Sequence, residues 1–219
     1  MSTKDPNARV SVREGEDLTT AATSGRLNWR VVDIVVAAVL GVAVGLIFWL
    51  WNSLGNAWYG AMSAITPGLG GIAAGIWFLG GPLGGLIIRK PGAALLVEMI
   101  AASVSAVIGN IWGITTLYSG FAQGILAEIV FLIFAYRRWD LPVALFSGAA
   151  AGVGAWLLEL FLTPNLPKGF TFNAIYLASN AISGLVLAGL LAWLLTKALA
   201  ETGVLDRFAS GRTQQATAR

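Results

Sequence analysis

The chain has 219 residues, of which 57% are hydrophobic and 11% charged, and its mean hydropathy of +0.75 lies outside the range of soluble globular domains. At roughly 20 apolar residues per helical crossing of a bilayer, it has room for about six crossings and for no separate soluble catalytic or nucleotide-binding domain. It contains no cysteine and no histidine, which excludes disulfides, thiolate or imidazole metal sites and catalytic triads that use either side chain. No cofactor is expected. Nucleic-acid binding is not expected either, because the net charge of +3 comes from short basic clusters between apolar runs.

Taken in chain order, the apolar runs predict an all-α integral membrane protein with six transmembrane helices. Residues 1–25 are polar and show no hydrophobic period, which predicts a disordered cytoplasmic tail, and residues 200–219 predict a second cytoplasmic tail. The helices expected within the transmembrane domain 26–199 are Val31–Trp51, Ala64–Ile88, Gly92–Gly109, Gly120–Tyr136, Leu141–Leu162 and Phe170–Ala198. Glycines crowd the second run, so we expect that span to be bent or broken.

The loops between these runs differ sharply in their content of Lys and Arg. Basic residues of alternate loops and of the tails fall on one side, whereas the opposite loops contain only Lys168. By the positive-inside rule, both chain ends are cytoplasmic. The basic residues on that side are Arg26, Arg30, Arg89, Lys90, Arg137, Arg138, Lys197, Arg207 and Arg212.

The outer end of the first predicted helix has two further features. It gathers the aromatic residues Trp49, Trp51, Trp58 and Tyr59, which are expected to anchor it at the membrane surface. The stretch 52–60 that follows the helix is predicted to be a loop, and its length and glycines would allow it to close as a lid.

Three carboxylates lie inside predicted spans: Glu98, Glu128 and Glu159. An acidic residue at mid-membrane costs about 2.5 to 3.5 kcal/mol, and the interior of the predicted spans offers no Lys, Arg or His beside them. Each must be protonated, hydrogen-bonded to neutral groups, exposed to a water-filled cavity, or balanced by a cation from outside. A cationic or amine-bearing ligand meets that need most simply, although Glu159, near its helix end, can also simply reach water.

Polar and small residues around these carboxylates predict the walls of an outward-facing pocket. Small residues follow Glu98 at helical spacing on one face, which leaves space for a ligand. Gln123 lies about 140° around a regular helix from Glu128, so the two would approach one ligand from different angles. Asn173, Tyr176 and Asn180 form a second polar stripe. The residues that follow Glu98 are Ala102, Ser105 and Gly109.

Two aromatic residues lie in the predicted outer loop 110–119. Trp112 and Tyr118 could stack on a flat ring or anchor to lipid. The first helix carries a different feature, a stripe of small residues that allows close approach of another helix, either of a partner or of the same bundle. The residues of the stripe are Ala37, Gly41 and Gly45.

Several residues between Gly80 and Phe131 carry a family resemblance. In chain order they are Ile88-Arg89-Lys90-Pro91-Gly92-Ala93-Ala94, Glu98, Gly109-Asn110-Ile111-Trp112-Gly113, Gln123-Gly124, Ala127-Glu128 and Phe131. They resemble the YkoE family, whose members are substrate-binding S components of energy-coupling factor (ECF) transporters. The resemblance extends over all six predicted helices.

The resemblance implies that the transmembrane domain binds thiamine or its hydroxymethylpyrimidine (HMP) precursor on the outer side of a bacterial cytoplasmic membrane. A transmembrane coupling protein and two cytoplasmic ATPases would then drive release inward, and the small-residue stripe at Ala37, Gly41 and Gly45 would contact the coupling protein. The ligand contacts that it implies are Glu98, Gln123 and Glu128. With the pocket residues above, the expected ligand-binding set is Glu98, Gln123, Glu128, Trp112, Asn110, Tyr118, Tyr176, Asn180 and Glu159.

Three other functions compete with this interpretation. A self-sufficient carrier would use Glu98 and Glu128 to bind protons or sodium, and it would work without an ATPase. An intramembrane enzyme is disfavoured because the sequence has no His-Glu metal motif, no paired-Asp signature and no cytoplasmic catalytic loop. A purely structural subunit would leave two mid-membrane glutamates unexplained. The chain also lacks a Gly-x-x-x-x-Gly-Lys phosphate loop, so any ATP-driven function must take its motor from another chain.

Overall fold

The computed structural model describes residues 27–205, 208, 210 and 211, and these residues are helical or form short connections. The predicted disordered tail at residues 1–25 lies outside them. In chain order, the elements are α2 (Val31–Ile65), the 3-10 helix η1 (Leu69–Phe78), α3 (Gly80–Ile88), α4 (Ala93–Ile108), α5 (Thr115–Ile133), α6 (Leu141–Leu162), the 3-10 helix η2 (Leu166–Lys168), α7 (Gly169–Ser183), the π-helix η3 (Gly184–Leu190) and α8 (Leu191–Glu201).

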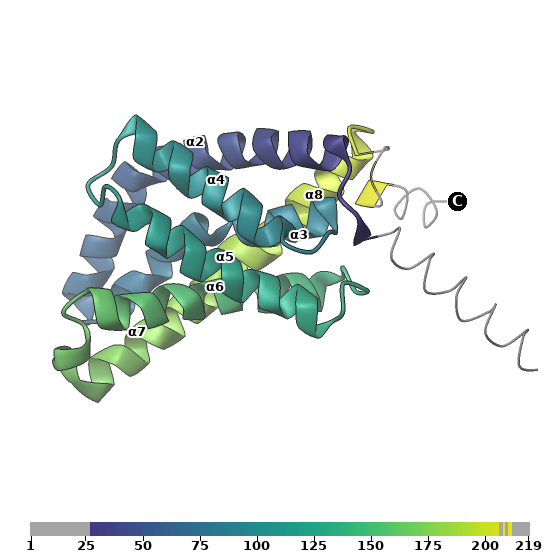
Figure 1. Ribbon diagram of the computed structural model, residues 1–219. Helices are drawn as coiled ribbons and strands as arrows, with labels where there is room; N and C mark the ends of the chain where they lie inside the picture. Colours follow the sequence, from purple (N-terminus) through teal and green to yellow (C-terminus); the bar gives the residue numbers. More distant parts are fainter. Residues whose placement is uncertain (1–26, 206–207, 209, 212–219) are drawn as a thin grey trace, which may run out of the picture.

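Five helical segments of the described chain are long and apolar enough to cross a membrane. They are Val31–Ile65, Leu69–Ile88, Thr115–Ile133, Leu141–Leu162 and Leu166–Glu201. The remaining apolar helix, α4, has 16 residues, just below the usual length of a crossing. Figure 1 shows the start of α2 and the end of α8 at the same end of the bundle, which is the arrangement that an even number of crossings requires.

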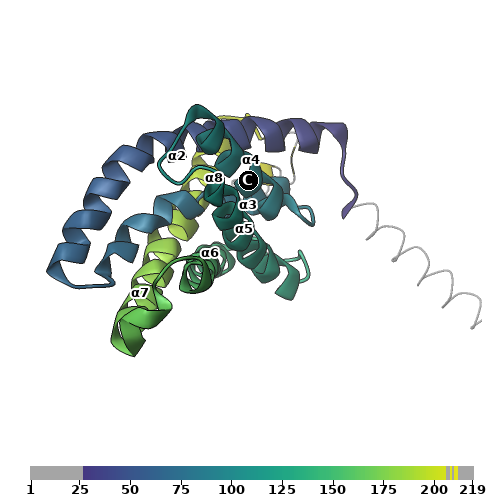
Figure 2. The ribbon, with the colours of Figure 1, turned by 60° about the vertical axis from the view of Figure 1, so that its left-hand side comes forward.

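The first helix is longer than the sequence predicts. At 1.5 Å per residue, the 35 residues of α2 span about 50 Å, well beyond the roughly 30 Å of a bilayer core. Figure 2 shows its later part arching over and turning along the bundle. The prediction of a loop at 52–60 is therefore wrong, and the lid hypothesis loses the loop on which it rested. Packing overrides the low helix propensity of this stretch, since the indole of Trp51 lies directly against the backbone of Gly55.

The second span is broken, as its glycines predict. It consists of η1 and α3, and its first half is a ten-residue 3-10 helix, an unusual length for this type. Two serines of α7 support the irregular backbone. The hydroxyl of Ser183 accepts from the Gly75 amide (2.9 Å) and donates to the Ile72 carbonyl, and the hydroxyl of Ser179 donates to the Gly68 carbonyl. These bonds satisfy polar groups that lipid could not.

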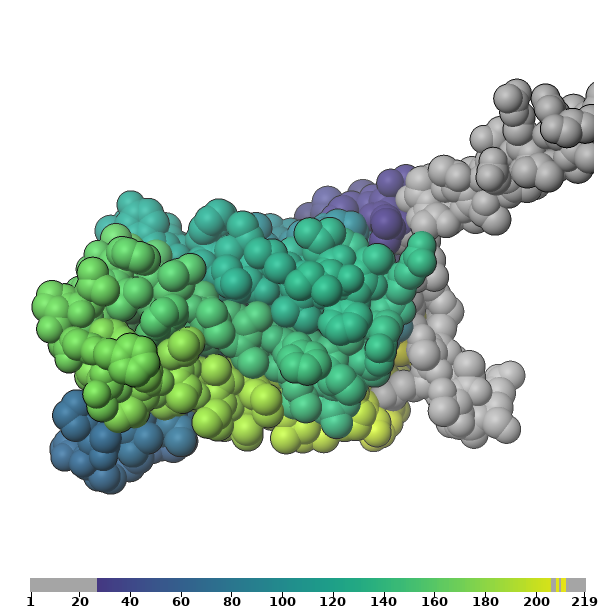
Figure 3. Space-filling view, turned by 90° about the horizontal axis from the view of Figure 1, so that it is seen from below, coloured from purple at the N-terminus to yellow at the C-terminus, as the bar shows by residue number. Residues whose placement is uncertain are grey.

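Close helix contacts hold the bundle together at glycines. A Cβ atom added to Gly148 in α6 would collide with the carbonyl oxygen of Gly184 in η3, so the two backbones touch. In the space-filling view, the green to yellow-green surfaces of α6, α7 and the elements after them lie side by side (Figure 3). The same kind of contact joins α2 to α4, where Gly41 and Gly45 pack against Ile100 and Val104.

The small-residue stripe of α2 is therefore covered within the chain. Ala37, Gly41 and Gly45 are buried, and a Cβ atom at Gly41 would lie 2.5 Å from the Cβ atom of Ile100 in α4. The expected contact with a coupling protein is not available at these positions in this packing. The alternative, contact within the chain's own bundle, accounts for the stripe.

The end of the bundle that carries the basic clusters is tied together by side chains. The indole of Trp29 donates to the carbonyl of Pro91 (2.9 Å), and the guanidinium of Arg89 lies 5.6 Å from the ring centre of Trp139. The segment after α8 also packs here: Leu205 and Phe208 are buried. This part of the predicted C-terminal tail belongs to the folded domain, because its apolar side chains pack in the hydrophobic core.

Candidate ligand-binding cavity

A cavity of about 380 Å³ lies at the end of the bundle opposite the basic clusters. Its walls come from the later part of α2, from η1, α4 and α5, and from the region where α6 is connected to α7. The volume falls within the range of small-molecule sites. Five of the nine expected ligand-binding residues line it: Glu98, Trp112, Gln123, Glu159 and Tyr176.

Glu98 is a fully buried polar group of the cavity wall. Its side chain is 0% exposed, and its Oε2 atom accepts a hydrogen bond from the Gly81 amide at 2.7 Å. Gly81 is in the first turn of α3, where backbone N–H groups have no helical partner and the helix dipole favours negative charge. The break in the second span therefore creates the donors that this buried carboxylate needs. The absence of a side chain at Gly80 lets the Glu98 carboxyl group come close to the start of α3, since a Cβ atom there would lie 2.7 Å from Oε2.

Gln123 of α5 is the second partner of Glu98. In the amide orientation that satisfies both neighbouring acceptors, its nitrogen donates to Glu98 Oε1 (3.2 Å) and to the Trp77 carbonyl (3.1 Å). The sequence pairs Gln123 with Glu128 as ligand contacts, but the structure pairs it with Glu98 instead. Of the ways to accommodate a membrane carboxylate, Glu98 uses hydrogen bonds to neutral groups together with a place on a cavity wall.

The cavity has two polar regions, or poles. Glu98 and Gln123 form the first, and Glu159 and Tyr176 form the second. The Tyr176 hydroxyl donates to Glu159 Oε2 at 2.5 Å, and the ring of Tyr59 meets that of Tyr176 edge to face at 6.3 Å. Lys168 also lines this end, with its ammonium bonded to the side chain of Asn165 at 2.6 Å. The cavity thus has one carboxylate deep in the wall and another near the connection of α6 to α7.

Aromatic rings line the cavity between the two poles. Trp77 of η1 and Trp112 meet edge to face with ring centres 5.4 Å apart. The indole nitrogen of Trp77 donates to Asn52 Oδ1 at 2.9 Å, which fixes the ring relative to α2. Flat aromatic walls between polar ends suit a flat ligand ring, and they also stabilise a cation.

Glu128 lies outside the cavity. Its two oxygens accept from the amides of Gly92 (2.7 Å), Ala94 (2.8 Å) and Leu95 (3.3 Å), and Oε1 also accepts from the hydroxyl of Tyr136 (2.7 Å). This carboxylate caps the N-terminus of α4 at the end with the basic clusters. Burial, together with the bond to Glu128, raises the pKa of Tyr136, which keeps the phenol a donor.

Three other expected residues do not line this cavity either. Asn110 Oδ1 accepts from the amides of Trp112 (2.9 Å) and Gly113 (2.8 Å), so it shapes the turn before α5. Tyr118 is exposed. Asn180 is buried beneath η1, and its amide nitrogen donates to the Tyr176 carbonyl at 2.8 Å.

Several polar and aromatic residues of the cavity were not expected there from the sequence, among them Asn52, Asn56, Tyr59, Trp77 and Lys168. The membrane-anchor interpretation of Tyr59 is replaced by a place on the cavity wall. A helix that continues past residue 51 would have placed Asn52, Asn56 and Tyr59 on one face at i, i+4 and i+7, so a correct helix end was the signal that was needed. Nothing in the sequence indicates which way Trp77 points, because η1 does not follow the α-helical period.

Known proteins match most of the chain. Residues 32–154 match the family described as ABC-type cobalt transport system, permease component. Over 187 residues, the chain is 34% identical to YkoE of Bacillus subtilis (strain 168), whose name gives it provisionally as an HMP/thiamine permease; the match covers 84% of this chain and 92% of that one. The chain belongs to the YkoE family. The resemblance found in the sequence is thereby confirmed.

A solved structure supports the same family assignment. The crystal structure of an S component of an ECF transporter superimposes with a TM-score of 0.74 at 31% identity, and the match covers 87% of this chain and 95% of that one. The YkoE family chain is thus a multi-pass membrane protein with the fold of an ECF S component. Its relatives are transporter components and not enzymes.

Proposed function

We propose that this chain is the substrate-capture component of an ECF-type importer in the bacterial cytoplasmic membrane, binding thiamine or HMP from the outer side for ATP-driven uptake. The observation that carries the proposal is the cavity whose wall joins Glu98 and Gln123 at one pole to Glu159 and Tyr176 at the other. Membership of the YkoE family supports the same ligand class, because the Bacillus subtilis relative is named for it.

The chemistry of thiamine suits this wall. Its aminopyrimidine donates hydrogen bonds that a carboxylate accepts, and its thiazolium is a permanent cation that a second carboxylate and aromatic faces stabilise. Trp77, Trp112 and Tyr59 supply such faces. HMP carries the pyrimidine half only, so it would use one pole.

The motor must come from other chains. The sequence has no phosphate loop, so we propose a transmembrane coupling protein and two cytoplasmic ATPases as partners. The basic end of the bundle, where both ends of the described chain lie, would then face the cytoplasm (Figure 1).

Isothermal titration of thiamine and of HMP into the purified protein tests the proposal. We expect saturable binding of at least one compound, and weaker binding of the thiamine analogue whose pyrimidine amino group is replaced by a carbonyl oxygen. The variant Tyr118→Phe should bind these compounds as the wild type does, because this tyrosine is exposed and does not line the cavity. Binding of neither compound would contradict the proposal.

Reconstituted vesicles separate this function from the ion-coupled carrier. We expect thiamine accumulation only when the coupling protein, the ATPases and ATP are present. Accumulation driven by a proton or sodium gradient in vesicles that contain this chain alone would favour the carrier instead.

A further inference from the structure

We propose that Asn52 is a positioning residue for ligand binding, which holds the indole of Trp77 in the cavity wall and separates the cavity from a groove on the side of the bundle. The inference rests on the proposed function for its effect on affinity. Its structural part, the fixing of Trp77 by Asn52, stands on the geometry alone.

Asn52 uses both ends of its amide. Oδ1 accepts from the indole nitrogen of Trp77 at 2.9 Å, and Nδ2 donates to the hydroxyl of Ser105 at 3.1 Å. One side chain of α2 thus joins η1 to α4. Because an amide has an acceptor end and a donor end, the two partners together fix its orientation and, with it, the angle of the indole.

Trp77 is also held from the other side of the cavity. Its carbonyl accepts from Gln123, whose amide nitrogen also donates to Glu98, and its ring meets Trp112 edge to face. A chain of bonds therefore runs from Asn52 through Trp77 and Gln123 to the deep carboxylate. If the indole turns, the aromatic face that Trp77 gives to the cavity wall is lost, and we expect the ligand to bind less tightly for that reason.

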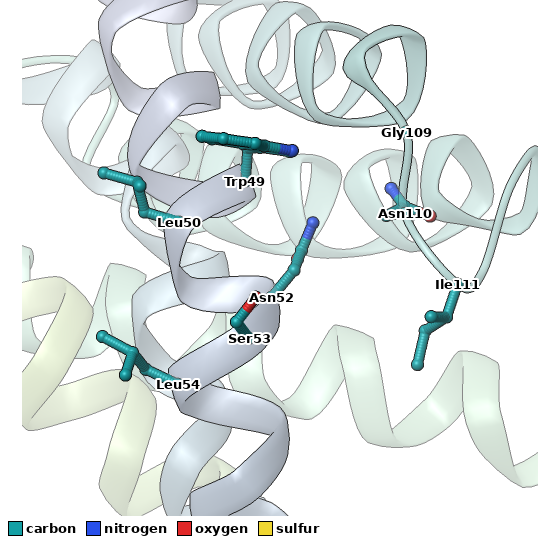
Figure 4. A pocket seen from close by; sticks show the side chains of 8 residues that line it. All are labelled: Trp49, Leu50, Asn52, Ser53, Leu54, Gly109, Asn110 and Ile111. Atoms are coloured by element: carbon teal, nitrogen blue, oxygen red, sulfur yellow. The ribbon is translucent and has the colours of Figure 1, made fainter.

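Asn52 lines a second hollow as well as the cavity. A groove of about 690 Å³ lies between α2 and the loop 109–111, and Asn52 is the described residue common to its lining and that of the cavity. Figure 4 shows its side chain directed from α2 toward the loop that carries Asn110. Apolar side chains such as Leu50 and Ile111 make up much of the groove wall. The amide of Asn52 therefore stands between the polar cavity and an apolar side of the bundle.

A merely structural role predicts a different pattern, and the chain offers a matched control. The indole of Trp51 donates to the carbonyl of Ala73 at 2.9 Å, so it also ties α2 to η1. Trp51 does not line the cavity. If only the attachment of α2 to η1 matters, Trp51→Phe and Trp77→Phe will have the same effect on ligand affinity. If Asn52 acts by placing Trp77, only Trp77→Phe will weaken binding.

The first experiment needs no ligand. In protein labelled with ¹⁵N-tryptophan in lipid nanodiscs, the indole N–H signals of the nine tryptophans are recorded, and Trp77→Phe and Trp51→Phe assign two of them. Asn52→Leu keeps the side-chain volume and removes both hydrogen bonds. We expect it to shift or broaden the Trp77 signal and to leave the Trp51 signal in place. An unchanged Trp77 signal would overturn the inference.

The second experiment is a double-mutant cycle on thiamine affinity. We expect Asn52→Leu and Trp77→Phe each to raise Kd about threefold to tenfold, the range for loss of one neutral hydrogen bond. The double variant should be no weaker than the weaker single variant, because both changes remove the same contact. Effects that multiply in the double variant, or an equal effect of Trp51→Phe, would overturn the inference. Failure of the wild type to bind would instead remove the proposed function, and the indole signals would still decide the role of Asn52.

Discussion

The carboxylate of Glu98 in α4 accepts a hydrogen bond from the Gly81 amide at the N-terminus of α3, at 2.7 Å. In the sequence, Glu98 is an acidic residue inside a span with no cationic partner. In the structure, the break in the neighbouring span turns a helix N-terminus toward it, and the Gly81 amide, which has no partner within its own helix, donates to the carboxyl oxygen. The irregular backbone and the buried acid thus depend on each other.

Glu98→Gln is expected to weaken thiamine binding about threefold to tenfold, because one hydrogen bond between the ligand and this side chain contributes about 0.5 to 1.5 kcal/mol. The substitution keeps the shape of the side chain, so the fold should persist. Titration calorimetry measures the affinity, and the far-ultraviolet circular dichroism spectrum checks the fold. An affinity equal to that of the wild type would show that the ligand does not use this pole.

Glu128→Gln is expected to give the opposite result. Glu128 accepts four hydrogen bonds, three from backbone amides at the start of α4 and one from Tyr136, and it does not line the cavity. An uncharged amide caps the helix less well, so we expect a loss of about 1 to 3 kcal/mol of stability with nearly unchanged Kd.

The thermal midpoint in detergent, followed by tryptophan fluorescence, measures that loss. Tyr136→Phe removes one of the four bonds and should lower the midpoint by less than Glu128→Gln does. A large change in Kd with an unchanged midpoint would return Glu128 to the ligand site that the sequence predicts.

Gly41→Leu distinguishes the two explanations of the small-residue stripe in α2. Because a Cβ atom at this position already lies 2.5 Å from Ile100, a leucine should force α2 away from α4 and destabilise the isolated chain, with overpacking costs of about 1 to 3 kcal/mol or more. Gly60→Ala, at a position with no atom within 4 Å of the added Cβ, is the matched control and should be tolerated. Normal stability of Gly41→Leu together with loss of ATP-driven uptake would instead support a partner contact.

Much of the helix pattern could be predicted from the sequence. The span Leu141–Leu162 is found with the predicted bounds, and the predicted third helix, Gly92–Gly109, differs from α4 by one residue at each end. Both runs are long, apolar and bounded by charge, proline or glycine, which are strong local signals. The end of α2 could not be predicted, because the polar residues and glycines at 52–60 are typical of a loop. The contacts that keep this stretch helical are visible only in the structure.

The site was harder to predict than the fold for a similar reason. The sequence sets Glu159 apart by its place near a helix end, but it does not distinguish Glu98 from Glu128, since each is an acid inside an apolar run. Only the three-dimensional arrangement separates them: Glu98 and Glu159 line the cavity, whereas Glu128 caps a helix at the other end of the bundle. Hydrogen bonds between residues far apart in the sequence, such as the one from Trp77 to Asn52, produce no periodic pattern in a single sequence from which they could be predicted.

The loop before α6 provides a test of charge at a helix start, away from the cavity. Asp140 caps α6 by accepting from the Val143 amide at 3.2 Å, and Arg138 donates to it at 2.6 Å. Burial alone would raise the pKa of Asp140, but these bonds outweigh it and lower the pKa below the ordinary value of 3.8. The folded state therefore favours the ionised form. Its contribution to stability is present above pH 3.8 and is lost as the pH falls through the lowered pKa.

Asp140→Ala should reduce stability at pH 7 by about 1 kcal/mol, the typical contribution of an N-cap. Asp140→Asn keeps a capping oxygen and loses only the charge, so we expect it to cost less, since its ion pair with Arg138 is largely exposed. Thermal midpoints of the three proteins between pH 7 and pH 3 measure both effects. The wild type and Asp140→Asn should converge as the pH falls below 3.8, because protonation then removes the charge from the wild type as well. A difference that stays constant to pH 3 would show that the charge of Asp140 does not stabilise the start of α6.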